Sequence, residues 1–408
     1  MRILAIHTYY RIRGGEDLSF DGETQLLREL GHTVRTFVAH NRDLETMPIG
    51  TRLRSITWNR VAANDLDREI ARFAPDVIYL NNVFMALSAS VAATCVRTEI
   101  PLLVAVRNFR LSCVSGTLFR AGRSCTSCVT AGRFAPGVLH RCHHGSLASS
   151  AVASLSASAI KREILGTQSL GRHPVEKQPP GKHVHFAAIS SHVARYLTTL
   201  GVPDSRIFVK PNTLYPDPGA GPGPGASREL VFVGRLEPEK GIGAVVDAFS
   251  RLPETSAKLT IIGSGSMLSG LQAAARRDNR ISITSGLRHD EVLARLGRAR
   301  CSIVPSLWNE PFGRVAVESL ARGTPTIVSP NGGLPELVEP GVSGIVVDPD
   351  DATALKAALA EMLQREYWGE EGRRAARRRF EDHSSPPVVG ARLTQIMSEI
   401  SSRPALAQ

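Results

Sequence analysis

The most informative part of the sequence is the segment SIVPSLWNEPFGRVAVESLARG, residues 302–323. Its β-branched start, Ser302–Val304, predicts a buried strand. Pro311 and Gly313 indicate a turn after that strand, because proline cannot continue a central strand and glycine is common where the chain reverses. The amphipathic pattern after the turn predicts a helix. A strand, a turn and a helix in this order form the repeating unit of parallel α/β folds.

Two glutamates belong to this unit. Glu310 lies in the loop at the carboxyl end of the predicted strand, and Glu318 lies inside the predicted helix. Eight helical positions would separate the two by about 12 Å, which is close to the span from the ribose to the sugar of a nucleotide diphosphate sugar. Carboxylates accept hydrogen bonds from hydroxyl groups, and the helix amino terminus between them suits a diphosphate. The alternative is one glutamate that favours its helix and one that is merely solvated.

Two cations follow another predicted strand. The segment VFVGRLEPEKG, residues 231–241, contains Gly234, Arg235 and Lys240. Ligands of open parallel sheets bind outside the carboxyl ends of the strands, so we expect both cations to face the same crevice as Glu310. There they would stabilise a departing diphosphate electrostatically, and no catalytic metal is expected. The alternative is that both are ordinary surface residues.

Short β-branched runs alternate with longer amphipathic stretches along the chain, which predicts two Rossmann-like series. The predicted strands of the first series are Arg2–Ile6, Thr33–Val38, Val77–Leu80, Leu102–Val106 and Val184–Ile189. Those of the second are Leu230–Val233, Leu259–Ile262, Ile281–Thr284, Ser302–Val304, Thr326–Val328 and Gly344–Val347. The helices between them include Gly22–Leu30, Ala62–Phe73, Leu87–Val96, Ser149–Leu165, Gly243–Arg251, Asp290–Ala299, Arg314–Arg322 and Thr353–Gln364.

The composition agrees with more than one globular domain. The chain has 408 residues, of which 42 % are apolar and 21 % charged, and one domain usually takes about 100–200 residues. No uncharged apolar run reaches the length of about 18 residues that a membrane-spanning helix needs. The first residues lack the features of a secretory signal, so we expect a cytoplasmic protein.

The chain is basic, with 49 Lys and Arg against 38 Asp and Glu and a formal net charge of +11. Such a surplus favours anionic partners. Aromatic residues are only 5 % of the chain and no nucleic-acid-binding motif occurs, so nucleic acid is not an expected partner. Nucleotide phosphates and an anionic membrane surface remain. An arginine-dense helical stretch, Arg373–Arg379, indicates a solvated basic face, with contact to a membrane surface as the alternative.

Several motifs of the second half resemble the donor-binding domain of the retaining glycosyltransferases of family four, which adopt the GT-B fold. The matching pieces are VKPN, VGRLEPEKG, IIGSGS, EPFGRVAVE and ARGTPTIVSPNGGLPELVEPGVSGIVVDPDD, and they occur in the family's order between residues 209 and 351. The resemblance implies an α/β chain with two Rossmann-like domains that face each other across a cleft.

The resemblance also implies roles for the matching residues. Arg235 and Lys240 would hold the diphosphate, Glu318 would bind the ribose hydroxyls, and Glu310 would contact the transferred sugar. Backbone groups of the EPFGRV segment would surround the sugar and phosphate, and glycines after two strands would let the chain approach the ligand. This donor-binding set consists of Gly234, Gly263, Gly265, Phe312, Gly313, Arg314 and Val315.

The first half resembles the family's acceptor domain more loosely. Its best match is RIRGGED, residues 11–17, where Gly14 and Gly15 are candidate phosphate contacts; an ordinary glycine-rich turn is the alternative. Two departures occur. The family often has histidines after its third and fourth strands, where this chain has YLNN, residues 79–82, and Arg107-Asn108. The chemistry on the acceptor side, or the donor preference, is therefore expected to differ.

The predicted domain boundaries follow from proline, glycine and cysteine. Residues 1–214 form the acceptor-side domain, with a cysteine-rich insertion at 108–145. Residues 215–228, which contain YPDPGAGPGPGAS, form a linker about which the domains would close. Residues 229–385 form the nucleotide-sugar-binding domain, and residues 386–408 form a helical tail that crosses back to the first domain. A second proline-rich stretch, Gly171–Lys182, is predicted to be a loop.

Four of the six cysteines cluster in the insertion: Cys113, Cys125, Cys128 and Cys142. Their spacing and loop-rich surroundings favour a structural zinc site, in which His140, His143 or His144 could replace one thiolate. Disulfides, which a reducing cytosol disfavours, and free thiols are the alternatives. A similar insertion occurs in a subset of family-four enzymes, which implies a structural role. Cys95 and Cys301 are expected to be buried packing residues.

The sequence thus predicts a retaining glycosyltransferase that moves a sugar from a nucleotide diphosphate donor to an acceptor hydroxyl. The acceptor would be a sugar or a lipid-linked sugar of polysaccharide or glycolipid biosynthesis, reached by peripheral contact with the inner membrane face. A catalytically silent nucleotide-sugar-binding or scaffold protein is one alternative, because the family's first-domain histidines are missing. A sugar-nucleotide epimerase, which shares the two-domain architecture, is another.

Overall fold

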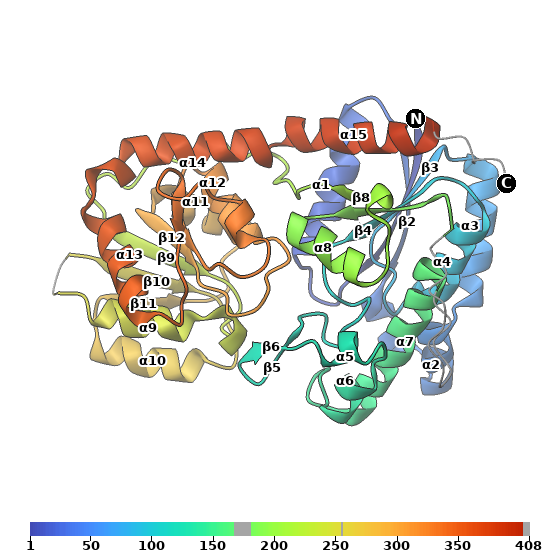
Figure 1. Cartoon of the computed structure of the whole chain (residues 1–408), viewed down its shortest axis with the longest axis horizontal. Coiled ribbons are helices and arrows are strands. Elements are labelled where there is room, and N and C mark those ends of the chain that lie inside the picture. The colour runs from blue at the N-terminus through green and yellow to red at the C-terminus, as the bar shows by residue number, and fades with distance from the viewer. Residues whose placement is uncertain (167–180, 254–255, 403–408) are drawn as a thin grey trace. The chain divides into compact units, whose positions relative to one another are not determined.

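The computed structural model describes residues 1–166, 181–253 and 256–402, so most of the loop predicted at 171–182 lies outside the described residues. The chain forms two compact units (Figure 1). The first contains Met1–Leu118, Cys125–Pro211 and the chain from Gly390 onward. The second contains Asn212–Val389 together with Phe119–Ser124.

A six-stranded parallel sheet forms the centre of the first unit, in the order β2-β1-β3-β4-β7-β8. The strands are β1 (Arg2–Tyr9), β2 (Thr33–His40), β3 (Val77–Leu80), β4 (Leu102–Val106), β7 (Val184–Ala188) and β8 (Ile207–Val209). The helices are α1 (Gly15–Glu29), α2 (Ile49–Thr57), α3 (Arg60–Phe73), α4 (Ser88–Arg97), α5 (Ser127–Thr130), α6 (Ala135–Leu139), α7 (Leu147–Leu165), α8 (Ser191–Thr199) and α15 (Pro386–Ser402).

One face of this sheet is covered by α1 and the last helix, α15. Phe20 and Leu27 of α1, and Leu393 and Ile396 of α15, belong to one buried cluster with alternate residues of β1, β3 and β4. The alternation arises because successive side chains of a strand point to opposite faces of its sheet. The chain therefore returns to the first unit at its carboxyl end and contributes to that unit's core.

The second unit repeats this architecture, with a parallel sheet in the order β11-β10-β9-β12-β13-β14. Its strands are β9 (Glu229–Val233), β10 (Lys258–Ile262), β11 (Ile281–Thr284), β12 (Cys301–Val304), β13 (Thr326–Val328) and β14 (Gly344–Val346). Its helices are α9 (Ile242–Ser250), α10 (Leu268–Arg277), α11 (His289–Arg298), α12 (Arg314–Ala321), α13 (Ala352–Gln364) and α14 (Glu370–His383). A small antiparallel pair, β5 (Phe119–Arg120) and β6 (Arg123–Ser124), completes the strands.

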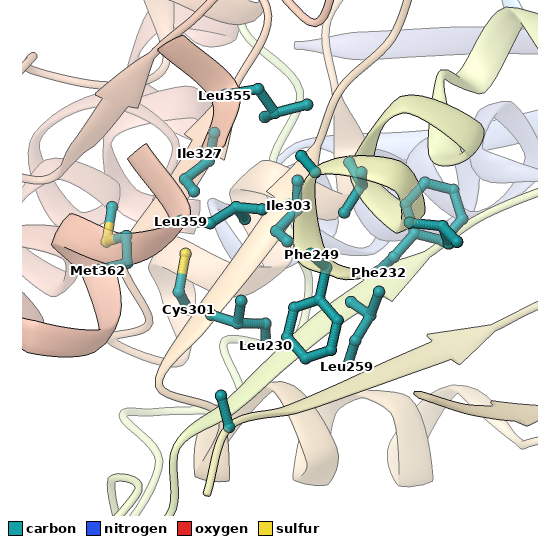
Figure 2. Packing of buried hydrophobic residues seen from close by; sticks show 14 of the residues in the cluster. Leu230, Phe232, Phe249, Leu259, Cys301, Ile303, Ile327, Leu355, Leu359 and Met362 are labelled. Carbon is teal, nitrogen blue, oxygen red and sulfur yellow. The ribbon is translucent and has the colours of Figure 1, made fainter. Parts of the chain in front are cut away.

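The core of the second unit lies on the face of the sheet that α9 and α13 cover. Leu230 and Phe232 of β9 pack there with Phe249 of α9 and Leu359 of α13 (Figure 2). The intervening Val231 belongs to a different cluster, on α11. Both faces of the sheet are thus apolar, which explains why its strands read as continuous β-branched runs.

The predicted fold class, an α/β chain with two Rossmann-like domains, is confirmed. Several local features differ from the sequence predictions, among them the unpredicted strands β5 and β6. Helix α1 begins at Gly15 rather than near Gly22, and the three-residue strand β8 was not predicted. The segment predicted as a linker is packed within the second unit: Gly221 N–H donates to the carbonyl of Arg322 at 2.9 Å, and Arg377 pairs with Asp217. The main part of the second unit begins at Asn212 instead, directly after Pro211 of the first unit.

Candidate functional site

Four loops meet at the carboxyl edge of the second unit's sheet. Strand β9 pairs with β10 on one side and with β12 on the other, and β12 pairs with β13, all in parallel. Their carboxyl ends therefore lie at one edge, where ligands of open α/β sheets bind. The loops that follow these strands contain all the predicted donor-site residues of this unit except those in the first turns of α12.

Lys240 and Glu310 meet at this edge although 70 positions separate them in sequence. The ammonium group of Lys240 donates to Oε2 of Glu310 at 2.7 Å, and both side chains are more than four-fifths buried. Ser306 Oγ at 3.0 Å and Trp308 Nε1 at 2.9 Å donate to the same oxygen. Lys240 also lies 4.9 Å from the centre of the Trp308 ring. The three donors leave Oε1 of Glu310 as the oxygen that could accept from a sugar hydroxyl.

Glu318 lies inside α12 and is almost fully buried, with 5 % of its side chain exposed. Its Oε1 accepts from Nε of Arg314 at 2.9 Å, one helical turn earlier, and lies 3.8 Å from Nε2 of His289. A buried carboxylate held by one cation keeps a second oxygen for a ligand. The sequence predicted the role of this carboxylate but gave no signal for His289, which lies outside every motif recognised in the chain.

Helix α12 begins at Arg314, which lies between Glu310 and Glu318 in the sequence. Gly313, the residue directly before the helix, has a φ of 107°, and a Cβ at this position would lie 2.3 Å from the side chain of Leu334. The positive φ and the lack of space both exclude a side chain at Gly313. The backbone of Phe312–Val315 therefore leads directly into the helix at the sheet edge. The amide groups of this first turn carry partial positive charge, which suits phosphate oxygens.

The glycine turn after β10 is held against the loop after β9. Glu237 accepts hydrogen bonds from the backbone N–H and the hydroxyl of Ser266, at 3.1 and 2.5 Å. These bonds, with the Ser266 hydroxyl as the largest cause, lower the pKa of Glu237 below its ordinary value. The approach is close: a Cβ at Gly263 would lie 1.9 Å from the carbonyl oxygen of Gly234. Gly234, Gly263 and Gly265 are thus brought together by packing of backbone on backbone.

Arg235 is placed differently from Lys240. Its guanidinium pairs with Glu239 at 2.7 Å and is 60 % exposed. It therefore lies on the solvent side of the loop, whereas Lys240 is drawn in by Glu310. The spacing of four residues between Arg235 and Glu239 could have indicated this local pair from the sequence.

In the first unit, Gly14 and Gly15 lie at the amino terminus of α1, as the glycine motif predicts for a strand-to-helix turn. Asp17 fixes this turn: it accepts from the N–H of Gly14 at 3.0 Å and pairs with Nε2 of His7 at 2.8 Å, both side chains being buried. These hydrogen bonds, against the cost of burial, lower the pKa of Asp17. Asp17 thus holds the turn by two hydrogen bonds, and the amides of the helix terminus follow the end of β1.

Arg107, which stands where the family often has a histidine, is engaged by a buried carboxylate. Its guanidinium donates to Glu23 of α1 at 2.6 Å and to the Tyr79 hydroxyl at 3.2 Å, and only 4 % of the side chain is exposed. Lys210, fully buried, forms an ion pair with the other oxygen of Glu23. Charge attraction from both cations lowers the pKa of Glu23 to about 2 against the effect of burial. Burial lowers the pKa of Lys210 to about 8.

A cavity of about 70 Å³ opens beside this cluster in the first unit. Val104, Ile160 and Ile164 supply apolar walls, and Asn108 and Arg110 supply polar groups. Nε and Nη1 of Arg110 are buried and have no hydrogen-bond partner among the described residues. The cavity thus combines apolar surface with donors that remain available.

The four clustered cysteines are gathered by backbone hydrogen bonds. Leu118 connects two of them, because its N–H donates to Sγ of Cys113 at 3.4 Å and its carbonyl accepts from Cys125 at 2.7 Å. Gly137 lies beside the other two: its carbonyl accepts from the N–H of Cys142 at 2.9 Å, and a Cβ at Gly137 would lie 3.2 Å from Sγ of Cys128. None of the six cysteines, all of which lie in the described part of the chain, forms a disulfide. Within the described residues no three His, Cys, Asp or Glu side chains are arranged to hold a metal ion, so zinc stays a prediction.

Residues 221–381 match the family model described as glycosyl transferases, group 1. The glycogen synthase of Mycobacterium tuberculosis H37Rv is 38 % identical over 173 residues, which are 41 % of this chain and 42 % of that protein. The D-inositol 3-phosphate glycosyltransferase of Corynebacterium efficiens is 34 % identical over 148 residues, 34 % of this chain and 35 % of that protein. The matches thus span less than half the length of these curated relatives.

Among solved structures, the sucrose-phosphate synthase of Thermosynechococcus elongatus aligns with a TM-score of 0.69 at 16 % identity, over 98 % of this chain and 99 % of that one. Anabaena Alr3699/HepE, solved in complex with UDP and glucose, aligns with a TM-score of 0.63 at 15 % identity, over 98 % and 100 % of the two chains. These likenesses show the GT-B fold along the chain. The family match, over residues 221–381, shows that the second unit resembles the group 1 glycosyl transferases. In the part of the chain that the structure describes, no helix is long and apolar enough to cross a membrane.

Proposed function

We propose that this protein is a retaining glycosyltransferase that moves a sugar from a nucleotide diphosphate sugar to an acceptor hydroxyl, in polysaccharide or glycolipid biosynthesis. The observation that carries the proposal is the Lys240–Glu310 pair beside the amino terminus of α12, with Glu318 buried in the same helix. One cation, one helix terminus and two carboxylates at one sheet edge match the charges and hydroxyl groups of such a donor. The UDP complexes of Anabaena HepE support a nucleotide ligand in this fold.

In this proposal each group has one task. Lys240 and the amides of α12 stabilise the negative charge that develops on the departing diphosphate. Arg235, exposed beside them, swings toward the outer phosphate when the donor binds. Glu310 accepts from a hydroxyl of the transferred sugar, and Glu318 accepts from the ribose. Retention follows from attack on the same face as the leaving group, with a donor phosphate oxygen taking the acceptor's proton. No catalytic metal is required by this scheme.

The acceptor is proposed to bind to the first unit, at the cavity beside Asn108 and Arg110. Its apolar walls suit the ring face of a sugar or the start of a lipid chain, and the available Arg110 nitrogens suit oxygen atoms. Gly14 and Gly15 remain candidate phosphate contacts. A cytoplasmic protein with a net charge of +11 could reach a lipid-linked acceptor at an anionic membrane face, and pelleting with anionic liposomes at low salt tests this contact.

A turnover assay separates this function from its alternatives. The protein is incubated with one nucleotide sugar at a time, with and without a panel of acceptor sugars. Release of the nucleoside diphosphate that depends on an acceptor supports transfer. Isomerised donor without acceptor indicates an epimerase. Donor binding without turnover across the panel indicates a silent binding protein, an alternative favoured by the engagement of Arg107 with Glu23 in place of a family histidine.

The cysteine cluster gives a separate prediction. We expect one zinc ion per chain, held by Cys113, Cys125, Cys128 and Cys142, when the protein is prepared without chelators and measured by elemental analysis. The change Cys125→Ser should remove the metal and lower the melting temperature, because a structural zinc contributes directly to folding. The control Cys95→Ala, in α4, should keep it. Metal-free wild-type protein, or unchanged zinc in Cys125→Ser, would show that the cysteines are ordinary thiols.

A further inference from the structure

A second hollow lies on the second unit, away from the donor site. Its volume is about 580 Å³. Its walls are the loop 220–225, the residue before β12, Gly323 before β13, and the first two turns of α14. Because the strands of this sheet are parallel, residues that precede them lie at its amino edge. The donor site lies at the carboxyl edge, so the two hollows open at opposite edges of one sheet.

The side chains that line this hollow are strongly basic. They include five arginines and one acid: Arg300, Arg373, Arg374, Arg377, Arg378 and Glu370. The opposite wall, loop 220–225, is made of alanine, glycine and proline and contributes no charged side chain. Arg374 pairs with Glu370, and Arg377 pairs with Asp217 and Glu381. Among the described residues Arg300, Arg373 and Arg378 have no carboxylate within ion-pair distance.

The half-buried Arg373 is held in place by hydrogen bonds to the surrounding backbone and is not simply surrounded by solvent. It donates to the carbonyl groups of Ala299, Gly297, Gly221 and Arg322, at 3.0–3.5 Å. Carbonyl groups satisfy its hydrogen bonds but do not neutralise its charge. Burial, followed by the nearby positive charges of Arg322 and Arg300, lowers the pKa of Arg373 to about 10. This corrects the prediction that Arg373–Arg379 is simply a solvated basic face.

The shape of the hollow is fixed by backbone contacts. Gly221 N–H donates to Arg322 and Gly223 N–H donates to the carbonyl of Gly297 at 3.1 Å. A Cβ at Gly221 would lie 2.4 Å from the α-carbon of Gly297, so the loop is seated as closely as backbones allow. Helix α14, 14 residues long, begins at Glu370 in this wall. Its amino terminus adds the positive end of a helix dipole to the arginine side chains.

We propose that this hollow binds an anion that carries two or more phosphate groups. Uncompensated arginines, a helix amino terminus and a preformed wall are the features by which proteins recognise phosphate. Three cations without an acidic partner require more than one negative charge for neutrality, and the volume has room for a diphosphate or a longer phosphate chain. The site is independent of the proposed transfer reaction, since it shares no residue with the donor site.

Calorimetric titration of the full-length protein with inorganic tripolyphosphate at low salt tests this proposal. The variant Arg374→Gln/Arg378→Gln changes two exposed side chains of the hollow that support no other element. We expect at least about tenfold weaker binding in this variant, since each charged hydrogen bond contributes substantially. The control Arg276→Gln/Arg277→Gln removes the same charge from the exposed end of α10 and should bind as wild type does. Lys240→Ala, which impairs the donor site, should also keep this binding.

Vesicles that contain a lipid whose headgroup carries two or more phosphate groups distinguish the source of the phosphate. Binding of tripolyphosphate that depends on Arg374 and Arg378 assigns the hollow to a dissolved ligand. Vesicle binding with the same dependence, and without tripolyphosphate binding, assigns it to a lipid headgroup. The proposal is overturned if neither binds, if the hollow variant binds as tightly as wild type, or if the α10 control loses as much affinity as the hollow variant.

Discussion

Replacing Lys240 by alanine is expected to lower the rate of nucleoside diphosphate release by about 10²–10³-fold while the protein stays folded. The ammonium group is held at the sheet edge by Glu310 at 2.7 Å and by the Trp308 ring, so it needs no rearrangement to meet the developing charge. Glu310 keeps its bonds from Ser306 and Trp308 in the variant. The loss should therefore appear in kcat and in kcat/KM together, as for an interaction made in the transition state.

A matched change isolates the position from the charge. Lys258→Ala removes the same charge from the exposed start of β10, at the opposite edge of the sheet. It should transfer sugar at the wild-type rate, measured as initial velocity with the donor that the protein binds. Wild-type velocity in Lys240→Ala would remove this lysine from the mechanism. Arg235→Ala should have a smaller effect, because that side chain is paired with Glu239 and exposed.

The change Glu23→Gln should destabilise the first unit by about 3–5 kcal/mol, the usual cost of leaving a buried charge without its partner. Here two buried cations, Arg107 and Lys210, would lose their shared carboxylate. Urea unfolding followed by hydrogen exchange in peptides of β1 and β3 would measure this loss in the first unit alone. The control Glu29→Gln, on the exposed side of α1, should change the stability by less than about 0.5 kcal/mol.

Two further measurements test the same prediction. The double variant Glu23→Gln/Lys210→Met removes one of the two stranded cations and should be more stable than the single variant. The pH dependence has a definite sign. The folded pKa of Glu23, about 2, lies below its ordinary value of 4.5, so its stabilisation is full above pH 4.5 and is lost as the pH falls toward 2. Glu23→Gln should lack this part of the acid transition; an unchanged acid transition would contradict the assignment.

Much of the fold could be predicted because both sheets are buried on both faces. Continuous β-branched runs such as Leu102–Val106 predict such strands well. Strand β8 was missed because three residues, Ile207–Val209, give too short a signal. The start of α1 was missed because Gly15 and Gly22 disfavour a helix by themselves. The packing of Phe20 and Leu27 against the sheet outweighs that preference.

The donor site was predictable because its residues follow strands, and parallel strands end at a common edge. That rule brought Lys240 to Glu310 across a long stretch of sequence. The buried cluster of the first unit was not predictable in the same way. Glu23 looks like an exposed helix residue in the sequence, and only the register of Phe20, Glu23 and Leu27 on one helix face places it over the sheet. The role of Arg107 therefore required the structure.

Nucleotide binding by the wild-type protein and by Glu318→Ala tests the central claim most directly. Melting temperatures are measured with UDP and with GDP, and with inorganic pyrophosphate to measure the stabilisation that phosphate groups alone provide. One of the two nucleotides, at 100 times its dissociation constant, should raise the wild-type melting temperature by about 5 °C or more, and this increase should largely disappear in Glu318→Ala. Neither nucleotide raising the melting temperature, or an equal increase in Glu318→Ala, would contradict a nucleotide-sugar site at the carboxyl edge of the second sheet.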